Sequence, residues 1–198
     1  MQNTYKWEIT PTTWPVAIRN CPKCGNSSLY ECSGNFRVNA NHNAIDVWLI
    51  YQCNNCNNTW NMDILSRTNV KSIDKELYHK FLSNNKELAK FYAFDSTTLG
   101  RNRANINYEN IGYNVTGETI QYSELTSACE VDIHCAFPFE LRLDRLLVKQ
   151  LGLSREQIKK LCKDGKIIST GGKNITKTKM KDDLRLILYP ETIAHIMG

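Results

Sequence analysis

The stretches Cys21-Pro22-Lys23-Cys24 and Cys53-Asn54-Asn55-Cys56 repeat one cysteine spacing within a chain of 198 residues. Two thiolates separated by two residues can be directed at one ion by a tight turn, and two such turns complete a tetrahedral zinc site. Because sulfur would fill every position, none remains for water or substrate. We therefore expect one structural zinc ion per chain, bound by Cys21, Cys24, Cys53 and Cys56. The alternative of four unliganded core thiols does not explain two matched pairs.

The segment between the cysteine pairs alternates apolar and polar residues in two runs, 36–40 and 45–49, around a turn-prone 41–43. This pattern predicts a β-hairpin that joins the two turns, and residues 60–64 predict a third strand. Together with an N-terminal arm, these elements predict a zinc ribbon over residues 1–70. A ribbon of this size buries little apolar surface, so metal binding should supply much of its folding energy.

Other cysteines and histidines offer weaker candidates for metal ligands. Cys32 and His42 lie between the pairs and could replace or flank a ligand, although their spacing follows no metal-site pattern. A second site formed by Cys129, His134 and Cys135 is a further alternative. Strand alternation, however, directs His134 away from both of these cysteines, which favours core thiols.

Composition indicates a folded cytoplasmic protein. The chain is 41% hydrophobic, which suffices for ordinary cores, and no run approaches the length of a membrane span. The first residues lack the layout of a signal peptide, and the eight cysteines form no disulfide-like framework. No membrane partner is expected.

Charge is unevenly distributed along the chain. Residues 142–185 contain 13 Lys and Arg against 5 Asp and Glu, a net charge of +8. The net charge of the whole chain is +5, which less this +8 leaves −3 for the rest. A basic last third indicates an anionic partner, with nucleic acid or acidic lipid as the candidates.

Two consecutive amphipathic helices are predicted within this basic region. The first has an apolar row at 143, 147 and 151 and ends at Gly152, whereas the second begins with a capping box formed by Ser154 and Gln157 and ends near Gly165. Strands are expected to follow at 167–168 and 184–188. The candidate phosphate-binding side chains of this helix pair are Arg142, Arg145, Lys149, Arg155, Lys159, Lys160, Lys163 and Lys166.

The region 139–189 resembles the RNA-binding domain named after small-subunit ribosomal protein S-four. The resemblance rests on Arg-Leu-Asp at 142–144, Gly-Leu-Ser-Arg at 152–155 and Lys-Asp-Gly-Lys-Ile at 163–167. It implies a domain of two helices plus strands over residues 139–198. A mixed helical and strand segment at 71–138 would connect this domain to the ribbon, so the expected fold class is α+β.

The whole chain also resembles the bacterial family called domain of unknown function 1062. The matching stretches are Phe36-Arg37-Val38-Asn39-Ala40-Asn41, Ile45-Asp46-Val47-Trp48-Leu49-Ile50 and Thr59-Trp60-Asn61. This resemblance supports the ribbon and implies no activity.

The leading functional hypothesis is a noncatalytic RNA-binding or ribosome-associated protein that recognises structured RNA through its basic helix pair. One alternative is an adaptor whose ribbon docks on a protein partner. Another is an RNA-modifying enzyme, because S-four domains often accompany such enzymes, although no catalytic motif supports it. A solvated basic surface without a partner is the simplest alternative.

Overall fold

The computed structural model describes residues 3–109, 111–137, 139–180 and 183–190. Within them the chain forms ten β-strands in two sheets and five α-helices, which confirms the predicted α+β class. Two short 3₁₀ helices are also present, η1 (Val70–Ser72) and η2 (Tyr122–Glu124). The chain divides into two compact units, residues 13–112, called the inserted unit, and residues 1–12 with 113–198, called the split unit. No described helix is both long enough and apolar enough to cross a membrane.

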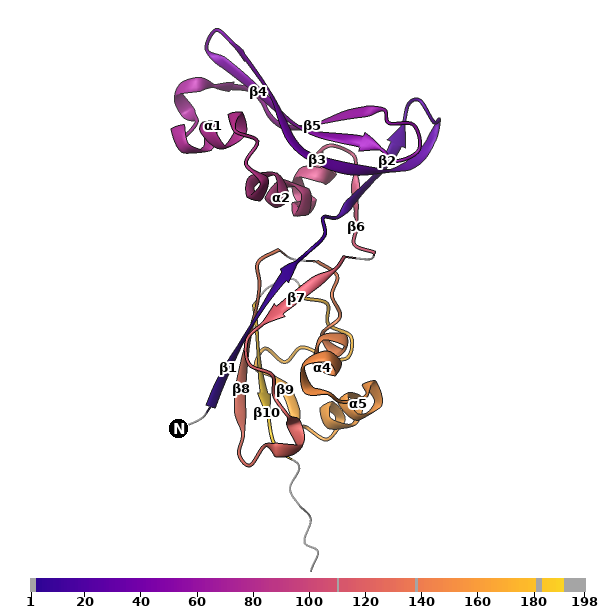
Figure 1. Ribbon diagram of the computed structural model, residues 1–198, viewed down its shortest axis with the longest axis vertical. Helices are drawn as coiled ribbons and strands as arrows, with labels where there is room; N and C mark the ends of the chain where they lie inside the picture. Colours follow the sequence, from indigo (N-terminus) through magenta and orange to yellow (C-terminus); the bar gives the residue numbers. More distant parts are fainter. Residues whose placement is uncertain (1–2, 110, 138, 181–182, 191–198) are drawn as a thin grey trace, which may run out of the picture. The chain divides into compact units, whose positions relative to one another are not determined.

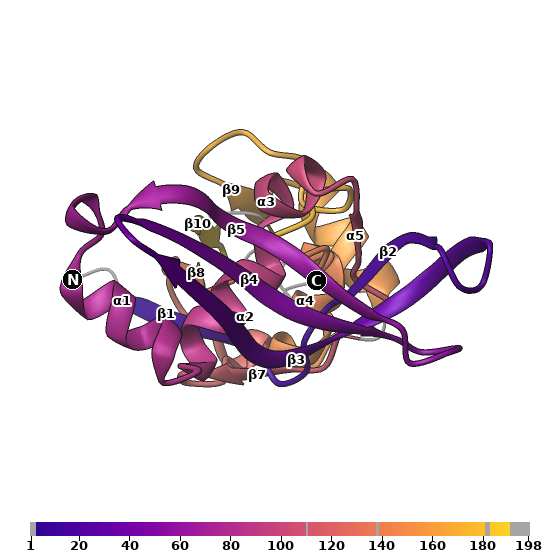
Figure 2. The same ribbon diagram turned by 90° about the horizontal axis from the view of Figure 1, so that it is seen from above.

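The inserted unit contains an antiparallel sheet of order β5-β4-β3-β2-β6 (Figure 2). Its strands are β2 (Val16–Cys21), β3 (Asn26–Asn41), β4 (Ala44–Cys53), β5 (Thr59–Asn69) and β6 (Asn105–Asn107). The predicted pairing of residues 36–40 with 45–49 is confirmed, and residues 60–64 lie in the next strand, β5. The cysteine turns therefore follow β2 and β4, and the apolar core extends along the sheet as far as Cys21 and Cys53.

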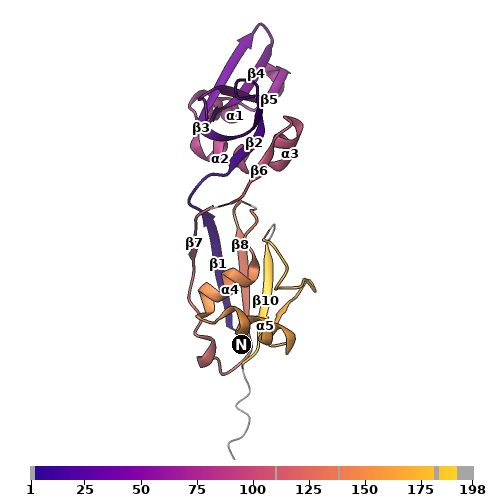
Figure 3. The same cartoon turned by 90° about the vertical axis from the view of Figure 1, so that its right-hand side faces the viewer.

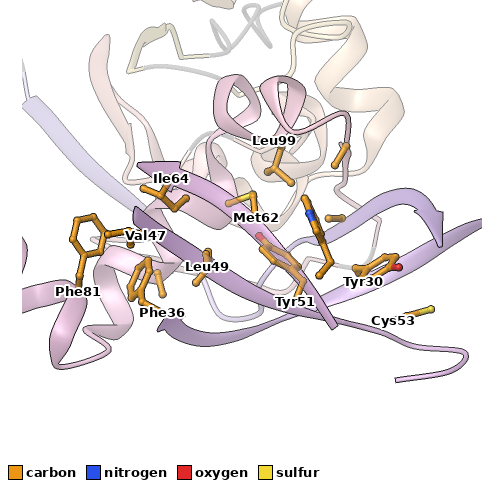
Figure 4. Packing of buried hydrophobic residues seen from close by; sticks show 14 of the residues in the cluster. Tyr30, Phe36, Val47, Leu49, Tyr51, Cys53, Met62, Ile64, Phe81 and Leu99 are labelled. Carbon is orange, nitrogen blue, oxygen red and sulfur yellow. The ribbon is translucent and has the colours of Figure 1, made fainter. Parts of the chain in front are cut away.

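Three helices cover one face of this sheet: α1 (Lys75–Leu82), α2 (Lys86–Phe94) and α3 (Ser96–Arg101). Side chains of Asp74 and Asn85 cap the first two, as their capping propensity predicts. Phe81 of α1 meets Phe36 of β3 edge-on, with ring centroids 5.0 Å apart, inside the core shown in Figure 4. Since Phe81 and Leu99 are fully or almost fully buried there, these helices belong to the same core as the sheet.

The split unit contains a sheet of order β7-β1-β8-β10-β9 (Figures 1 and 3). Its strands are β1 (Asn3–Pro11), β7 (Tyr113–Thr116), β8 (Cys129–Cys135), β9 (Ile167–Ser169) and β10 (Leu184–Leu188). The helices α4 (Leu143–Leu151) and α5 (Arg155–Lys163) cover one face of it, as Figure 1 shows. Buried apolar residues alternate along the three central strands: Trp7, Ile9, Val131, Ile133, Leu186 and Leu188. The opposite face therefore carries the polar residues of these strands.

β1 lies between β7 and β8, antiparallel to the first and parallel to the second. Trp7 of β1 donates a hydrogen bond from Nε1 to the Glu118 carbonyl oxygen at 2.8 Å. Gly117 has φ +124°, and a Cβ there would lie 2.0 Å from the carbonyl oxygen of Lys6. Only glycine fits this close approach, so the turn after β7 is locked against β1.

The structure divides the chain differently from the predicted segments 1–70, 71–138 and 139–198. β1 pairs with β7 and β8 in the split unit, and the helices of 75–101 pack on the cysteine-containing sheet. The alternation of Tyr5, Trp7 and Ile9 signals a strand but does not identify its partner, because pairing is decided by distant residues. Residues 191–198 of the last predicted segment lie outside the described residues.

A fragment of residues 139–198 should not unfold cooperatively, because it lacks β1, β7 and β8. In contrast, joining residue 11 to residue 113 through a short glycine-rich turn should give a folded split unit, since Pro11 and Tyr113 face each other in the β1–β7 pair. Thermal denaturation followed by circular dichroism compares the two proteins. A cooperative transition for 139–198 alone would contradict the strand order described above.

Candidate metal centre and nucleic-acid interface

The sulfur atoms of Cys21, Cys24, Cys53 and Cys56 all lie within 4.8 Å of one another. The separation is 3.6 Å between Cys21 and Cys56 and 3.9 Å between Cys24 and Cys53. Four sulfurs placed about 2.3 Å from a common centre in a tetrahedron would be about 3.8 Å apart. The geometry of the four thiols therefore fits a tetrahedral metal ion.

The two cysteine turns share one backbone conformation and one hydrogen-bond pattern. The residue after each pair, Gly25 or Asn57, has a positive φ, +71° and +57° respectively. Its N–H donates to the carbonyl oxygen of the first cysteine of its pair, at 2.9 Å for Gly25 and 2.8 Å for Asn57. Glycine and asparagine are the residues that adopt this conformation most readily. Each turn is thus shaped by its backbone so that both thiols face the same point.

Tyr30 lies at the base of the cluster, opposite Cys53 in the β3–β4 pair, and Figure 4 shows its hydroxyl end near that cysteine. The Tyr30 hydroxyl lowers the pKa of Cys21 to about 6, more than burial raises it. Hydrogen bonding with Cys56 and, to a lesser extent, burial raise the pKa of Cys24 to about 12. Cysteine binds a metal ion as the thiolate, so a cation bound here would displace protons from the thiols.

The other candidate ligands lie apart from this cluster, which is the one group of potential ligands found among the described residues. Burial raises the pKa of Cys32 to about 11, as expected for a core thiol. Cys129 and Cys135 are buried in β8, whereas His134 is exposed and pairs through Nδ1 with Asp183 at 2.6 Å. His42 occupies the β3–β4 turn with φ +52°. These positions agree with the predicted separation of His134 from the two cysteines.

The basic helix pair is organised around a buried carboxylate. Asp144 in the first turn of α4 is 1% exposed and accepts hydrogen bonds from Arg142 at 2.9 and 3.0 Å. Arg155, the first residue of α5, donates from Nε to the same carboxylate at 3.0 Å. The two arginine side chains remain 44% and 54% exposed. Asp144 therefore joins the starts of the two helices and fixes both guanidinium groups at the surface.

The remaining predicted phosphate-binding residues have different neighbours. Lys149 lies 5.1 Å from the centre of the Tyr113 ring of β7. Lys159 and Lys163 line a hollow beside α5. Arg145 and Lys160 are exposed, whereas Lys166 is half-buried. The predicted residues thus extend around the helix pair from β7 to the far side of α5.

Three residues important for these sites carry little signal in the sequence. Tyr30 and Ser169 are ordinary strand residues whose proximity to a cluster or hollow depends on distant pairing. Asp144 carries some signal, because it is a charged residue directly after Leu143, the first residue of the apolar row of α4. A buried acid in such a place requires cationic partners, which makes nearby arginines the natural candidates.

Comparison with known proteins gives one family. A family model described as protein of unknown function (DUF1062) matches residues 38–173, more than half of the chain. The match includes the second cysteine pair, both helices of the basic pair and β9. No curated protein and no solved structure gave a significant match.

The double variant Cys53→Ser/Cys56→Ser should lose the bound metal ion, because two of its four ligands are removed. The inserted unit should also lose its cooperative thermal transition when the metal ion is lost, since the cysteine turns anchor both β2 and β4. Elemental analysis and calorimetry measure the two effects. Cys162→Ser, which changes a thiol outside the cluster, is the control and should keep its metal. Equal metal content in both proteins would refute the site.

Asp144→Asn should lower the free energy of unfolding at pH 7 by about 2 kcal/mol, since it removes a buried charge with two partners. Burial raises the pKa of Asp144, but Arg142 and Arg155 outweigh burial and hold the pKa below its usual range. The stabilisation is therefore present above the unfolded pKa of about 3.9 and is lost as the pH falls through the folded pKa.

Urea denaturation at neutral and acidic pH measures this difference between the parent protein and Asp144→Asn. The exposed Asp164→Asn serves as the matched control. The gap between parent and Asp144→Asn should narrow in acid, whereas Asp164→Asn should resemble the parent at each pH. A gap of the same size at all pH values would show that the carboxylate charge is not responsible.

Proposed function

We propose that this chain, which belongs to the DUF1062 family, is a noncatalytic RNA-binding protein with a zinc ribbon in its inserted unit and an S-four-like surface on its split unit. Structured RNA, free or within the ribosome, would bind across α4 and α5. The proposal rests mainly on one observation, the buried Asp144 that holds Arg142 and Arg155 at the surface.

The hydrogen bonds of the two arginines leave donors available for a ligand. A guanidinium group has five N–H donors. Arg155 uses its Nε on Asp144, so both of its terminal amino groups lack a partner within the described part of the chain. Arg142 uses Nε and Nη2, the latter also reaching the Thr176 carbonyl oxygen at 2.8 Å. Two fixed and partly free guanidinium groups are well suited to bind phosphate in a bidentate manner.

The surrounding charge supports an RNA partner. The exposed basic residues of the helix pair beyond these arginines are Arg145, Lys149, Lys159, Lys160 and Lys163. Successive turns of a helix place such side chains at intervals that allow contact with several phosphates. Contacts of this kind depend on backbone shape more than on base sequence, which favours structured RNA over a defined sequence motif.

Zinc is the metal that best suits the cysteine cluster. Four thiolates in tetrahedral arrangement are the donor set of structural zinc sites, and a site with four sulfur ligands has no open position for catalysis. In this proposal zinc stabilises the inserted unit, while the RNA contacts come from the split unit. The metal would therefore affect RNA binding only through the folding of the chain.

Arg145→Glu/Lys160→Glu should weaken binding to a structured RNA by roughly tenfold or more at moderate salt, because two cationic contacts become repulsive. For the parent protein, about three to four phosphate contacts predict a loss of about two orders of magnitude in affinity between 50 and 200 mM salt. Fluorescence anisotropy with a labelled RNA hairpin measures both quantities.

The control is Lys71→Glu/Lys75→Glu, which changes the net charge equally at two exposed positions of the inserted unit. It should bind RNA nearly as tightly as the parent. Equal losses in the two double variants would show that only net charge matters. Undiminished binding by Arg145→Glu/Lys160→Glu would favour an adaptor that docks through its cysteine-containing unit.

A further inference from the structure

A hollow of about 490 Å³ lies in the split unit between α5 and the segment 168–176. Three lysines line it, Lys159 and Lys163 of α5 and Lys173 of the following loop. Ile168 and Ile175 contribute apolar surface. Its size falls within the range of small-ligand sites, about 300–1,000 Å³, and its mixture of apolar surface with a few polar groups is typical of them.

Ser169 supplies a second, independent observation. This residue lines the hollow, is 9% exposed, and its Oγ has no hydrogen-bond partner among the described residues. Its backbone is fixed by pairing with Leu186 of β10. A Cβ added to Gly171 would lie 4.0 Å from this oxygen, at an ordinary van der Waals distance. A buried hydroxyl without a partner is costly unless a ligand or water satisfies it.

The charges around the hollow specify the kind of ligand. Lys159, Lys163 and Lys173 form no ion pair within the described ranges, and no acidic residue lines the hollow there. Three unpaired ammonium groups favour a phosphate. The isoleucine surface suits a flat ring, and a hydroxyl can donate to or accept from the edge of a nucleobase. Phosphate, ring and polar edge together describe a nucleotide.

The position of the hollow connects it to the proposed RNA surface. It shares α5 with Arg155 and Lys160, and its wall residue Thr176 accepts a hydrogen bond from Arg142. We propose that this hollow receives one unpaired nucleotide of the RNA, an inference that rests on the proposed function. The phosphate of that nucleotide would lie among the three lysines, and its base would lie against Ile168 and the Ser169 hydroxyl. Bulges and loops of structured RNA provide such unstacked nucleotides.

The test compares two RNA hairpins that differ by one bulged nucleotide, with the full-length protein and its variants. The parent should bind the bulged hairpin about tenfold more tightly than the fully paired one. Ser169→Ala and Lys173→Ala should each reduce this preference by about threefold or more, through loss of a hydrogen bond or of a phosphate contact. Lys177→Ala, an exposed lysine of the same loop that does not line the hollow, should retain it.

Thermal stability separates a ligand contact from a structural role. Ser169→Ala removes a hydroxyl without a partner, so its melting temperature should equal or exceed that of the parent. A preference for the bulge that survives both hollow variants would overturn the inference, as would equal binding of the two hairpins by the parent. Both results leave the proposed function intact provided that the hairpins still bind. Absence of binding to either hairpin would instead refute the proposed function itself.

Discussion

The parallel pairing of β1 with β8 is the constraint on which the rest of the chain depends. Parallel neighbours require a crossover connection, and here that connection contains the whole inserted unit as well as β7. Because β1 and β7 pair antiparallel with Pro11 opposite Tyr113, the two ends of the inserted unit lie close together, and Gly112 donates its N–H to the Thr13 hydroxyl at 2.9 Å. This arrangement allows the inserted unit to fold around its own core while β1 completes the sheet that supports α4 and α5. The N-terminal strand thus contributes to a surface formed more than 130 residues later in the chain.

Different interactions stabilise the two units. The inserted unit covers one face of its sheet with helices, and at one end of its sheet four thiols lie in an arrangement that fits one metal ion. The split unit relies on an apolar sheet face under two helices, with a buried carboxylate joining the helix starts. That carboxylate has a double consequence, because the cations that neutralise Asp144 remain half-exposed. In the proposed function, the contact that stabilises the fold also prepares a surface for phosphate.

Local features of this structure could be predicted from the sequence, and features that depend on distant contacts could not. The cysteine spacing identified the four-thiol cluster, and the capping box of Ser154 with Gln157 identified the start of α5, because each depends on residues only a few positions apart. The strand at Trp7 was also apparent from alternation, yet its partner was not, since both possible sheets offer an apolar face. The unpartnered hydroxyl of Ser169 could not be predicted at all, because its burial without a hydrogen-bond partner depends on how β9, α5 and the following loop pack together.

The central claim is that RNA phosphates contact the helix pair of the split unit. Ultraviolet crosslinking of bound RNA to the full-length protein, followed by mass spectrometry of the modified peptides, tests it most directly. The account predicts crosslinks within residues 142–176, which contain α4, α5 and the hollow. Crosslinks confined to residues 13–112, at the same RNA occupancy, would contradict it and would assign recognition to the cysteine-containing unit instead.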